Sequence, residues 1–140
     1  MPGMSSTTFR KPNKYGAFRI DTPEGRFDSQ KEFRRSCELK LLQRAGEIRD
    51  LKRQVDFVLV PEQREPPQTQ KNGREKPGKL LERQVVYRAD FVYLERQKSP
   101  AEAAEAWRTV VEDAKGVKTK EYIIKRKLML YVHGIKIREV

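Results

Sequence analysis

The residues best suited to chemistry are Asp113, Ala114 and Lys115, which end an apolar, β-branched run containing Val110 and Val111. On a β-strand, residues i and i+2 project from the same face, so Asp113 and Lys115 would project together and Glu112 would point to the opposite face. A carboxylate beside a lysine suits cation binding and the stabilisation of charge on a phosphate. An ordinary ion pair at a strand end is the alternative, and the triplet alone favours that alternative.

The same acid-x-lysine spacing occurs twice more, at Glu38-x-Lys40 and Asp50-x-Lys52. Glu38 falls in the middle of a helical pattern, where residues i and i+2 point in different directions. Asp50 falls in a helix-to-strand connection with no evident acidic partner strand. Context therefore favours the Asp113 triplet.

A second acid, Asp90, interrupts the apolar run 85–93. A lone carboxylate there is costly unless it is paired or binds a cation, although the solvent face of an edge strand is an alternative position. On adjacent strands, Asp90 and Asp113 would hold Mg²⁺, for which Mn²⁺ would substitute, and the backbone carbonyl of Ala114 is a further candidate ligand. Lys115 would then stabilise the attacking hydroxide or the phosphate.

Apolar patterning predicts the elements that position these residues. Ser29 and Glu32 form a capping-box pattern that starts a helix over about 29–45, whose two apolar flanks predict that it is largely packed. The order predicted from there is strands at 55–60, 84–94 and 107–114, a helix at 119–133 with an apolar stripe of Ile124, Leu128 and Tyr131, and a strand at 135–140. A hairpin at 15–28 precedes this order, and a short helix at 99–106 interrupts it. The fold class is α/β, with a mixed α+β sheet.

The domain boundaries follow from composition. Residues 1–14 are polar and basic and predict a disordered arm, leaving one domain over 15–140. Residues 61–83 contain four prolines and two glycines and predict a long mobile loop or the tip of a wide hairpin, with a nucleic-acid clamp as one hypothesis.

The charge balance limits the partners. Lysine and arginine outnumber aspartate and glutamate by 31 to 20, a net charge of +11 that attracts nucleic acid. A role in solubility, or in binding another acidic partner, is the alternative. The single cysteine, Cys37, excludes a disulfide framework, and no membrane-length apolar run or secretion signal is visible, so we expect an intracellular protein without a membrane partner.

Five blocks together resemble the PD-(D/E)XK nuclease superfamily, and more closely small phage-encoded proteins of that superfamily described as Holliday-junction resolvases. The blocks are residues 27–32, 38–42, 87–93, 110–119 and 134–140. The resemblance implies a restriction-endonuclease-like αβββαβ core with an N-terminal hairpin. It also implies that Asp90 and Asp113 are the metal-binding acids, Lys115 the motif lysine and Glu32 the helix acid that completes the site.

Two departures from the family pattern concern Asp90. Ala89 precedes it where the family often has proline, and Asp90 and Asp113 are 23 positions apart, more than a tight hairpin needs. Glu32 also has a purely structural interpretation as part of the capping box, in which case Glu38 is the reserve candidate for the helix acid.

Candidate DNA contacts surround the triplet. They are Lys118, Lys120, Tyr122, Lys125, Lys127 and, at the start of the first core strand, Gln54. Lysines there would bind phosphates without reading sequence. A solvated helix face is an equally good interpretation of each lysine, and a structural polar residue is the stronger one for Gln54.

The expected function is Mg²⁺-dependent, structure-specific endonuclease activity on four-way junctions or other branched DNA, by a homodimer that places two cuts symmetrically. The expected setting is the bacterial cytoplasm, with a phage or prophage gene as the source. A nuclease of this fold for nicked, flapped or linear DNA is one alternative, and a non-catalytic DNA-binding protein of the same fold is another.

Overall fold

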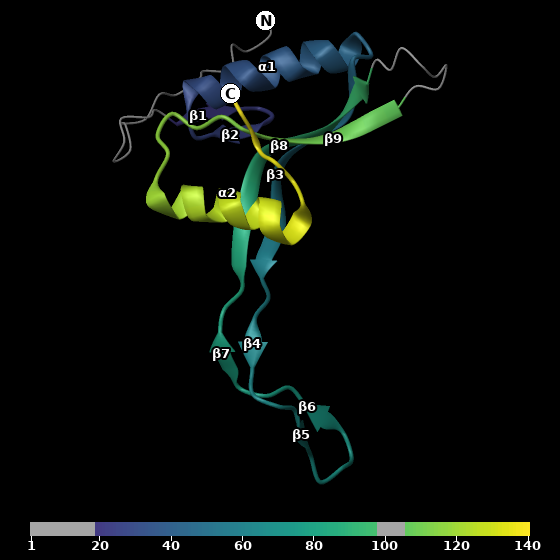
Figure 1. Ribbon diagram of the computed structural model, residues 1–140, viewed down its shortest axis with the longest axis vertical. Coiled ribbons are helices and arrows are strands. Elements are labelled where there is room, and N and C mark those ends of the chain that lie inside the picture. The colour runs from purple at the N-terminus through teal and green to yellow at the C-terminus, as the bar shows by residue number, and fades with distance from the viewer. Residues whose placement is uncertain (1–18, 98–105) are drawn as a thin grey trace, which may run out of the picture.

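The structure is a computed structural model that describes residues 19–97 and 106–140. The basic arm expected at 1–14 lies outside the described residues, as does the short helix expected at 99–106 except for Ala106, which begins a strand. In the described part, two α-helices and a four-stranded mixed sheet of order β10-β9-β8-β3 form the body of the molecule (Figure 1).

The body consists of β1 (Ile20–Thr22), β2 (Gly25–Phe27), α1 (Gln30–Arg44), β3 (Ile48–Val60), β8 (Val85–Gln97), β9 (Ala106–Asp113), α2 (Lys120–His133) and β10 (Arg138–Glu139). The predicted mixed α+β class is confirmed, and so is the order helix, three strands, helix, strand. The pairs β3–β8 and β8–β9 are antiparallel, and β10 runs parallel to β9. Both β3 and β8 are longer than their apolar runs predicted.

The two helices cover opposite faces of the sheet. Val110 packs in a cluster with Leu39 of α1, whereas Val111 packs in a cluster with Met129 of α2. Successive strand residues point to opposite faces, so β9 is sandwiched between the helices. The side chains of the next two residues, Glu112 and Asp113, also point to opposite faces of the sheet, and both are fully buried.

Helix α1 begins as predicted, because Ser29 Oγ accepts the backbone N–H of Glu32 at 3.1 Å. The prediction that α1 is largely packed was wrong. Its buried residues are Glu32, Ser36 and Leu39, whereas Leu41 is 63% exposed. The spacing i, i+4, i+7 turns one narrow face to the sheet, and two of its three residues are polar.

Helix α2 begins at the Thr119 cap and ends at Gly134, whose φ of 67° is a left-handed conformation that suits glycine. The predicted apolar stripe does not form the buried face. Ile124 is 58% exposed and Tyr131 is 88% exposed, and the buried residues are Tyr122 and Met129. The single histidine, His133, is the last residue of α2, and its Nε2 donates to the Val58 carbonyl at 2.8 Å.

Residues 61–84 form a long two-stranded ribbon that projects from the ends of β3 and β8 (Figure 1). From here on, "the arm" means this ribbon and not the N-terminal residues 1–14. Its strands are β4 (Gln63–Arg64) paired with β7 (Leu80–Glu82), and β5 (Gln68–Thr69) paired with β6 (Glu75–Lys76). The segment predicted to be either a long loop or the tip of a wide hairpin therefore contains paired strands, and the hairpin prediction is confirmed. No helix in the described part of the chain has the length and apolar character needed to cross a membrane.

Candidate functional site

Asp90 and Asp113 meet on neighbouring strands. Phe91 of β8 pairs with Glu112 of β9, so the next residues along the antiparallel ladder are Asp90 and Asp113. Asp90 Oδ2 accepts the backbone N–H of Ala114 at 2.8 Å, which fixes its carboxylate across the end of β9. The long connection between the two acids thus leaves their strands directly paired.

Asp113 is buried and only partly satisfied. Its Oδ2 accepts the Tyr87 hydroxyl at 2.7 Å, while its buried Oδ1 has no hydrogen-bond partner in the structure. Lys115 Nζ lies 3.9 Å from that Oδ1, an ion-pair distance too long for a hydrogen bond. Burial raises the pKa of Asp113 to about 6, and the Asp90 carboxylate adds to the rise.

Glu32 divides its carboxylate between capping and the site. Its Oε2 accepts the backbone N–H of Asp28, the residue before the Ser29 cap, at 3.2 Å, so Glu32 holds the start of the helix in place of the usual capping-box bond. Its Oε1 points the other way and accepts Gln54 Nε2 at 2.9 Å. Burial raises the pKa of Glu32 to about 7, with Asp90 contributing. The two interpretations of Glu32 are therefore compatible, because each uses a different oxygen.

Gln54 joins the acids from β3. It lies opposite Asp90 in the β3–β8 ladder, and its Nε2 is 3.4 Å from Asp90 Oδ1 as well as 2.9 Å from Glu32 Oε1. Its φ of 52° is left-handed, which costs a non-glycine residue about 1–2 kcal/mol. The sequence suggested a DNA contact or a structural role for this residue. Its backbone conformation, which no residue pattern signals, places it inside the acidic cluster.

The donor set fits a hard cation at the aspartate pair. Among the described residues, no three acidic, histidine or cysteine side chains form a ready metal cage. The Gln54 amide stands between Glu32 and Asp90 and keeps Glu32 from converging directly on the aspartates. The orphaned Asp113 Oδ1 and the adjacent Asp90 still offer the carboxylate oxygens that Mg²⁺ prefers. The Ala114 carbonyl stays a predicted ligand.

Two clefts meet at Lys115. The first has a volume of about 280 Å³, and Glu32, Asp90, Ala114 and Lys115 are among its lining residues. The second, about 270 Å³, is lined by Tyr87, Arg88, Lys115, Thr119, Glu121, Tyr122 and Lys125. Lys115 thus stands between an acidic cleft and a cleft whose two other basic side chains are ion-paired, Arg88 with Asp56 and Lys125 with Glu121.

The other predicted DNA contacts fall in three environments. Lys118 and Lys125 are held in ion pairs, the first 2.5 Å from Glu139 and the second 3.1 Å from Glu121. Tyr122 is buried, with Lys115 Nζ 5.5 Å from its ring centroid, so it supports the lysine rather than facing a ligand. Lys120 and Lys127 are exposed on α2.

Glu112 points to the face opposite Asp113, as predicted; this is the α1 side, where Glu112 forms a structural network that the sequence did not reveal. Arg35 donates to both of its oxygens at 2.5 and 3.0 Å, and the Tyr93 hydroxyl donates at 2.6 Å. A buried carboxylate with three such bonds is well satisfied. Glu112 anchors the end of β9 from one face while Asp113 serves the site on the other.

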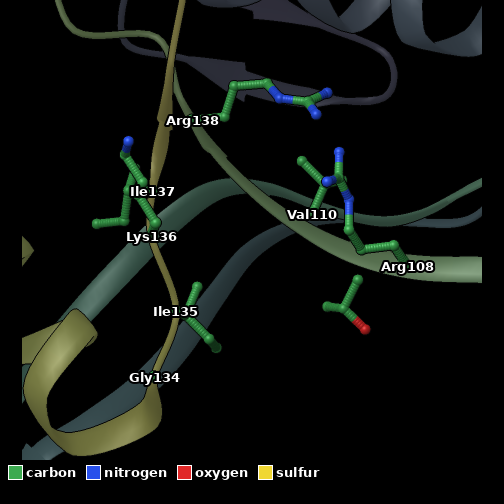
Figure 2. A pocket seen from close by; sticks show the side chains of 8 residues that line it. Arg108, Val110, Gly134, Ile135, Lys136, Ile137 and Arg138 are labelled. Carbon is green, nitrogen blue, oxygen red and sulfur yellow. The ribbon is translucent and has the colours of Figure 1, made fainter.

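A cleft of about 510 Å³ lies elsewhere, between β9 and the segment after α2. Figure 2 shows Arg108 and Val110 on one side of it and Lys136, Ile137 and Arg138 on the other. Arg108 and Arg138 both bind Glu95, at 2.9 and 3.0 Å. Its lining residues include no acid, histidine or cysteine that could bind a cation or act as a general base, so this cleft is not the candidate reaction site.

The fold and site together define a small α+β protein in which a buried aspartate, Asp113, is paired with the half-buried Asp90 and has a lysine beside it at a strand end. The chain belongs to the family described as "Protein of unknown function (DUF1064)", which matches residues 12–138. No curated protein and no solved structure matches the chain.

Proposed function

We propose that this protein is a Mg²⁺-dependent DNA endonuclease that cuts branched DNA, with four-way junctions as the favoured substrate. The observation that carries the proposal is the meeting of Asp90 and Asp113 on β8 and β9, with one buried oxygen of Asp113 unpartnered and Lys115 beside it. An unsatisfied buried carboxylate oxygen is costly, and cation binding offsets that cost.

Each residue has a distinct part in this mechanism. Asp90 and Asp113 bind the cation, and Tyr87 and the Ala114 N–H hold the two carboxylates in place. When bound, Mg²⁺ lowers the pKa of a coordinated water and offsets charge on the phosphate oxygens. Lys115, between the two clefts, orients the attacking water and stabilises negative charge on the phosphodiester. Glu32 lines the acidic cleft beside Asp90, and Gln54 holds Glu32 through the hydrogen bond to its Oε1.

The charge of the protein supports a polyanionic substrate. Its net charge is +11, and Arg88 and Lys125 line the second cleft beside Lys115, the first paired with Asp56 and the second with Glu121. A DNA backbone running from the acidic cleft past Lys115 would compete with these two acids for the cations. Such contacts position DNA without reading its sequence, as suits an enzyme that recognises a branch.

The proposal includes a homodimer, because junction resolution needs two cuts and a two-fold axis supplies two identical sites. The exposed apolar side chains of α2 give a surface for the second copy; they include Ile124, Leu130, Tyr131 and Val132. Light scattering of Tyr131→Glu beside the wild type tests this. A dimeric wild type and a monomeric variant are expected, and a monomeric wild type overturns the dimer.

The substrate assignment is tested with a labelled four-way junction, a linear duplex and a single strand, each incubated with Mg²⁺ or with EDTA. We expect Mg²⁺-dependent cleavage that is fastest on the junction. Binding without cleavage on any substrate would overturn the nuclease and favour a non-catalytic DNA-binding protein. Equal cutting of the junction and the linear duplex would remove the preference for branched DNA alone.

A further inference from the structure

The arm is a hairpin ribbon, paired at β4–β7 and β5–β6, with almost no hydrophobic support. In residues 61–84 only Gly78 is buried and only Leu80 is half-buried, while every other residue is exposed. Two-stranded ribbons without a packed face are marginally stable in water, so a core role does not explain this one. The arm projects away from both helices (Figure 1).

The arm nevertheless has a built shape. At its middle the strands cross so closely that a Cβ on Gly78 would lie 1.8 Å from the Glu65 carbonyl oxygen. Glu65 N–H donates to the Lys79 carbonyl at 2.9 Å, and Arg64 Nη1 donates to the Gly78 carbonyl at 3.1 Å. Only glycine fits this crossing, which sets the direction of the distal half.

The tip of the arm, the turn at residues 70–74, is basic, and its cationic side chains are exposed. Gln70 N–H donates to the Arg74 carbonyl at 2.8 Å and Gly73 N–H donates to the Gln70 carbonyl at 2.9 Å, which closes the turn. Lys71 and Arg74 are exposed on this turn, and neither is paired with an acid among the residues that the structure describes. A cation left unpaired by its own chain is suited to a phosphate.

The arm also has useful reach and position. Twelve residues separate the end of β3 from Asn72, which at about 3.3 Å per residue gives up to about 40 Å. One turn of duplex DNA rises about 34 Å, and its major groove admits a two-stranded ribbon. The cleft beyond Lys115 is lined by Tyr87 and Arg88, close to the point where the arm joins β8.

We propose that the arm is a second, remote contact for double-stranded DNA, in which Lys71 and Arg74 bind backbone phosphates about one helical turn from the catalytic cleft. This inference rests on the proposed function, since it assumes that DNA occupies that cleft. On a branched substrate the arm would hold one duplex while the cleft acts near the branch, which gives a physical basis for structure selectivity.

Two variants of the full-length protein test the arm. Lys71→Ala/Arg74→Ala removes the tip charges, and Gly78→Ala disturbs the strand crossing while leaving every charge in place. Arg44→Ala/Lys52→Ala removes the same charge from exposed residues near the opposite end of β3 and serves as the control. Thermal unfolding verifies that each variant keeps its fold, which is expected because the arm buries so little.

Binding is measured by fluorescence anisotropy in EDTA, as a function of salt, on duplexes of about 12 and about 40 base pairs. For the long duplex, the tip variant should lose about 10-fold in affinity, and its slope of log K against log salt should fall by about 2, since each phosphate contact contributes about 0.9. Gly78→Ala should weaken the long duplex similarly. The short duplex should bind the wild type, both arm variants and the control alike, and the control should also bind the long duplex as tightly as the wild type does.

Unchanged binding of the long duplex by the tip variant would overturn the arm contact and point to a different partner for the ribbon. If the tip variant lost the same affinity for the short and the long duplex, the arm would not contact DNA about one helical turn away from the cleft. Because the comparison is made without metal, absent Mg²⁺-dependent cleavage would overturn the nuclease and leave this result intact.

Discussion

The Tyr87 hydroxyl donates a 2.7 Å hydrogen bond to Asp113 Oδ2 and leaves Asp113 Oδ1 free to face Asp90 and Lys115. Burial and this bond raise the pKa of Tyr87 well above its usual value, so the phenol stays protonated and remains a donor. Tyr87 thereby sets which oxygen of Asp113 is available to a cation.

The first prediction concerns Tyr87→Phe, which removes this hydroxyl and preserves the ring. The freed Asp113 carboxylate would rotate, so we expect Mg²⁺ affinity and the cleavage rate each to fall by about 3–30-fold, which corresponds to about 0.7–2 kcal/mol. Calorimetric metal titration and single-turnover cleavage measure the two effects. Wild-type values for both would show that Tyr87 has no positioning role.

The second prediction is that the site costs stability in the absence of metal. Asp113 is fully buried beside Asp90, so Asp113→Asn removes a charge that burial penalises. In EDTA at pH 8 we expect the variant to unfold at a higher urea concentration, with a gain of about 1–3 kcal/mol. Asp50→Asn, at an exposed acid-x-lysine triplet, should change stability little. A destabilised Asp113→Asn protein would indicate a structural ion pair with Lys115.

The third prediction is a pH dependence of opposite sign for folding and for metal binding. The pKa values of Asp113 and Glu32 are raised, to about 6 and about 7, so the metal-free folded state binds more protons than the unfolded state between about pH 4 and 7. Stability in EDTA should therefore fall as pH rises through that window. Mg²⁺ binding needs the ionised acids, so its affinity should rise over the upper part of the same window.

Urea unfolding against pH and calorimetry in buffers of different ionisation enthalpy check the third prediction, the latter by detecting released protons. Asp90→Asn should flatten both profiles, because the Asp90 charge contributes to each raised pKa. Mg²⁺ binding with no proton release near pH 6 would contradict this view of the site.

The fourth prediction separates the side chain of Gln54 from its backbone. At a φ of 52°, Gln54→Gly should relieve strain and Gln54→Ala should not, so the glycine variant should be the more stable of the two by about 1 kcal/mol. Both variants remove the carboxamide between Glu32 and Asp90 and should alter Mg²⁺ affinity by the same factor. Denaturant unfolding measures the stabilities and metal titration measures the Mg²⁺ affinities. If Gln54→Gly binds Mg²⁺ more tightly than Gln54→Ala, in the same order as their stabilities, then Gln54 affects metal binding through its backbone and not through its carboxamide.

How much of this molecule the sequence could predict depended on the kind of feature. Local signals were reliable: Ser29 caps α1, α2 runs over Lys120–His133 where a helix was predicted at 119–133, and β-branched runs became the central strands. Asp113 was singled out by the strand context of its acid-x-lysine triplet and Asp90 as a lone carboxylate in an apolar strand, and the structure pairs their positions on β8 and β9. Helix faces were misjudged, since Ile124 and Tyr131 are as apolar as core residues and only tertiary packing leaves them exposed.

Features that depend on backbone geometry could not be predicted. Gln54 reaches the acids through a left-handed conformation that its residue type does not suggest. Prolines and glycines in 61–83 indicated a loop, but a proline is also tolerated beside a short strand, and Gly78 serves a strand crossing rather than a flexible hinge. The division of Glu32 between its cap and Gln54 likewise required both partners to be placed.

The measurement that tests the central claim most directly is single-turnover cleavage of a labelled four-way junction over a Mg²⁺ titration, with the wild type, Asp113→Asn and the control Asp50→Asn in parallel. We predict Mg²⁺-dependent cutting by the wild type and by Asp50→Asn, and a loss of at least about 1,000-fold for Asp113→Asn, about 4 kcal/mol of transition-state stabilisation. Cleavage by Asp113→Asn at the wild-type rate would contradict the assignment of this site.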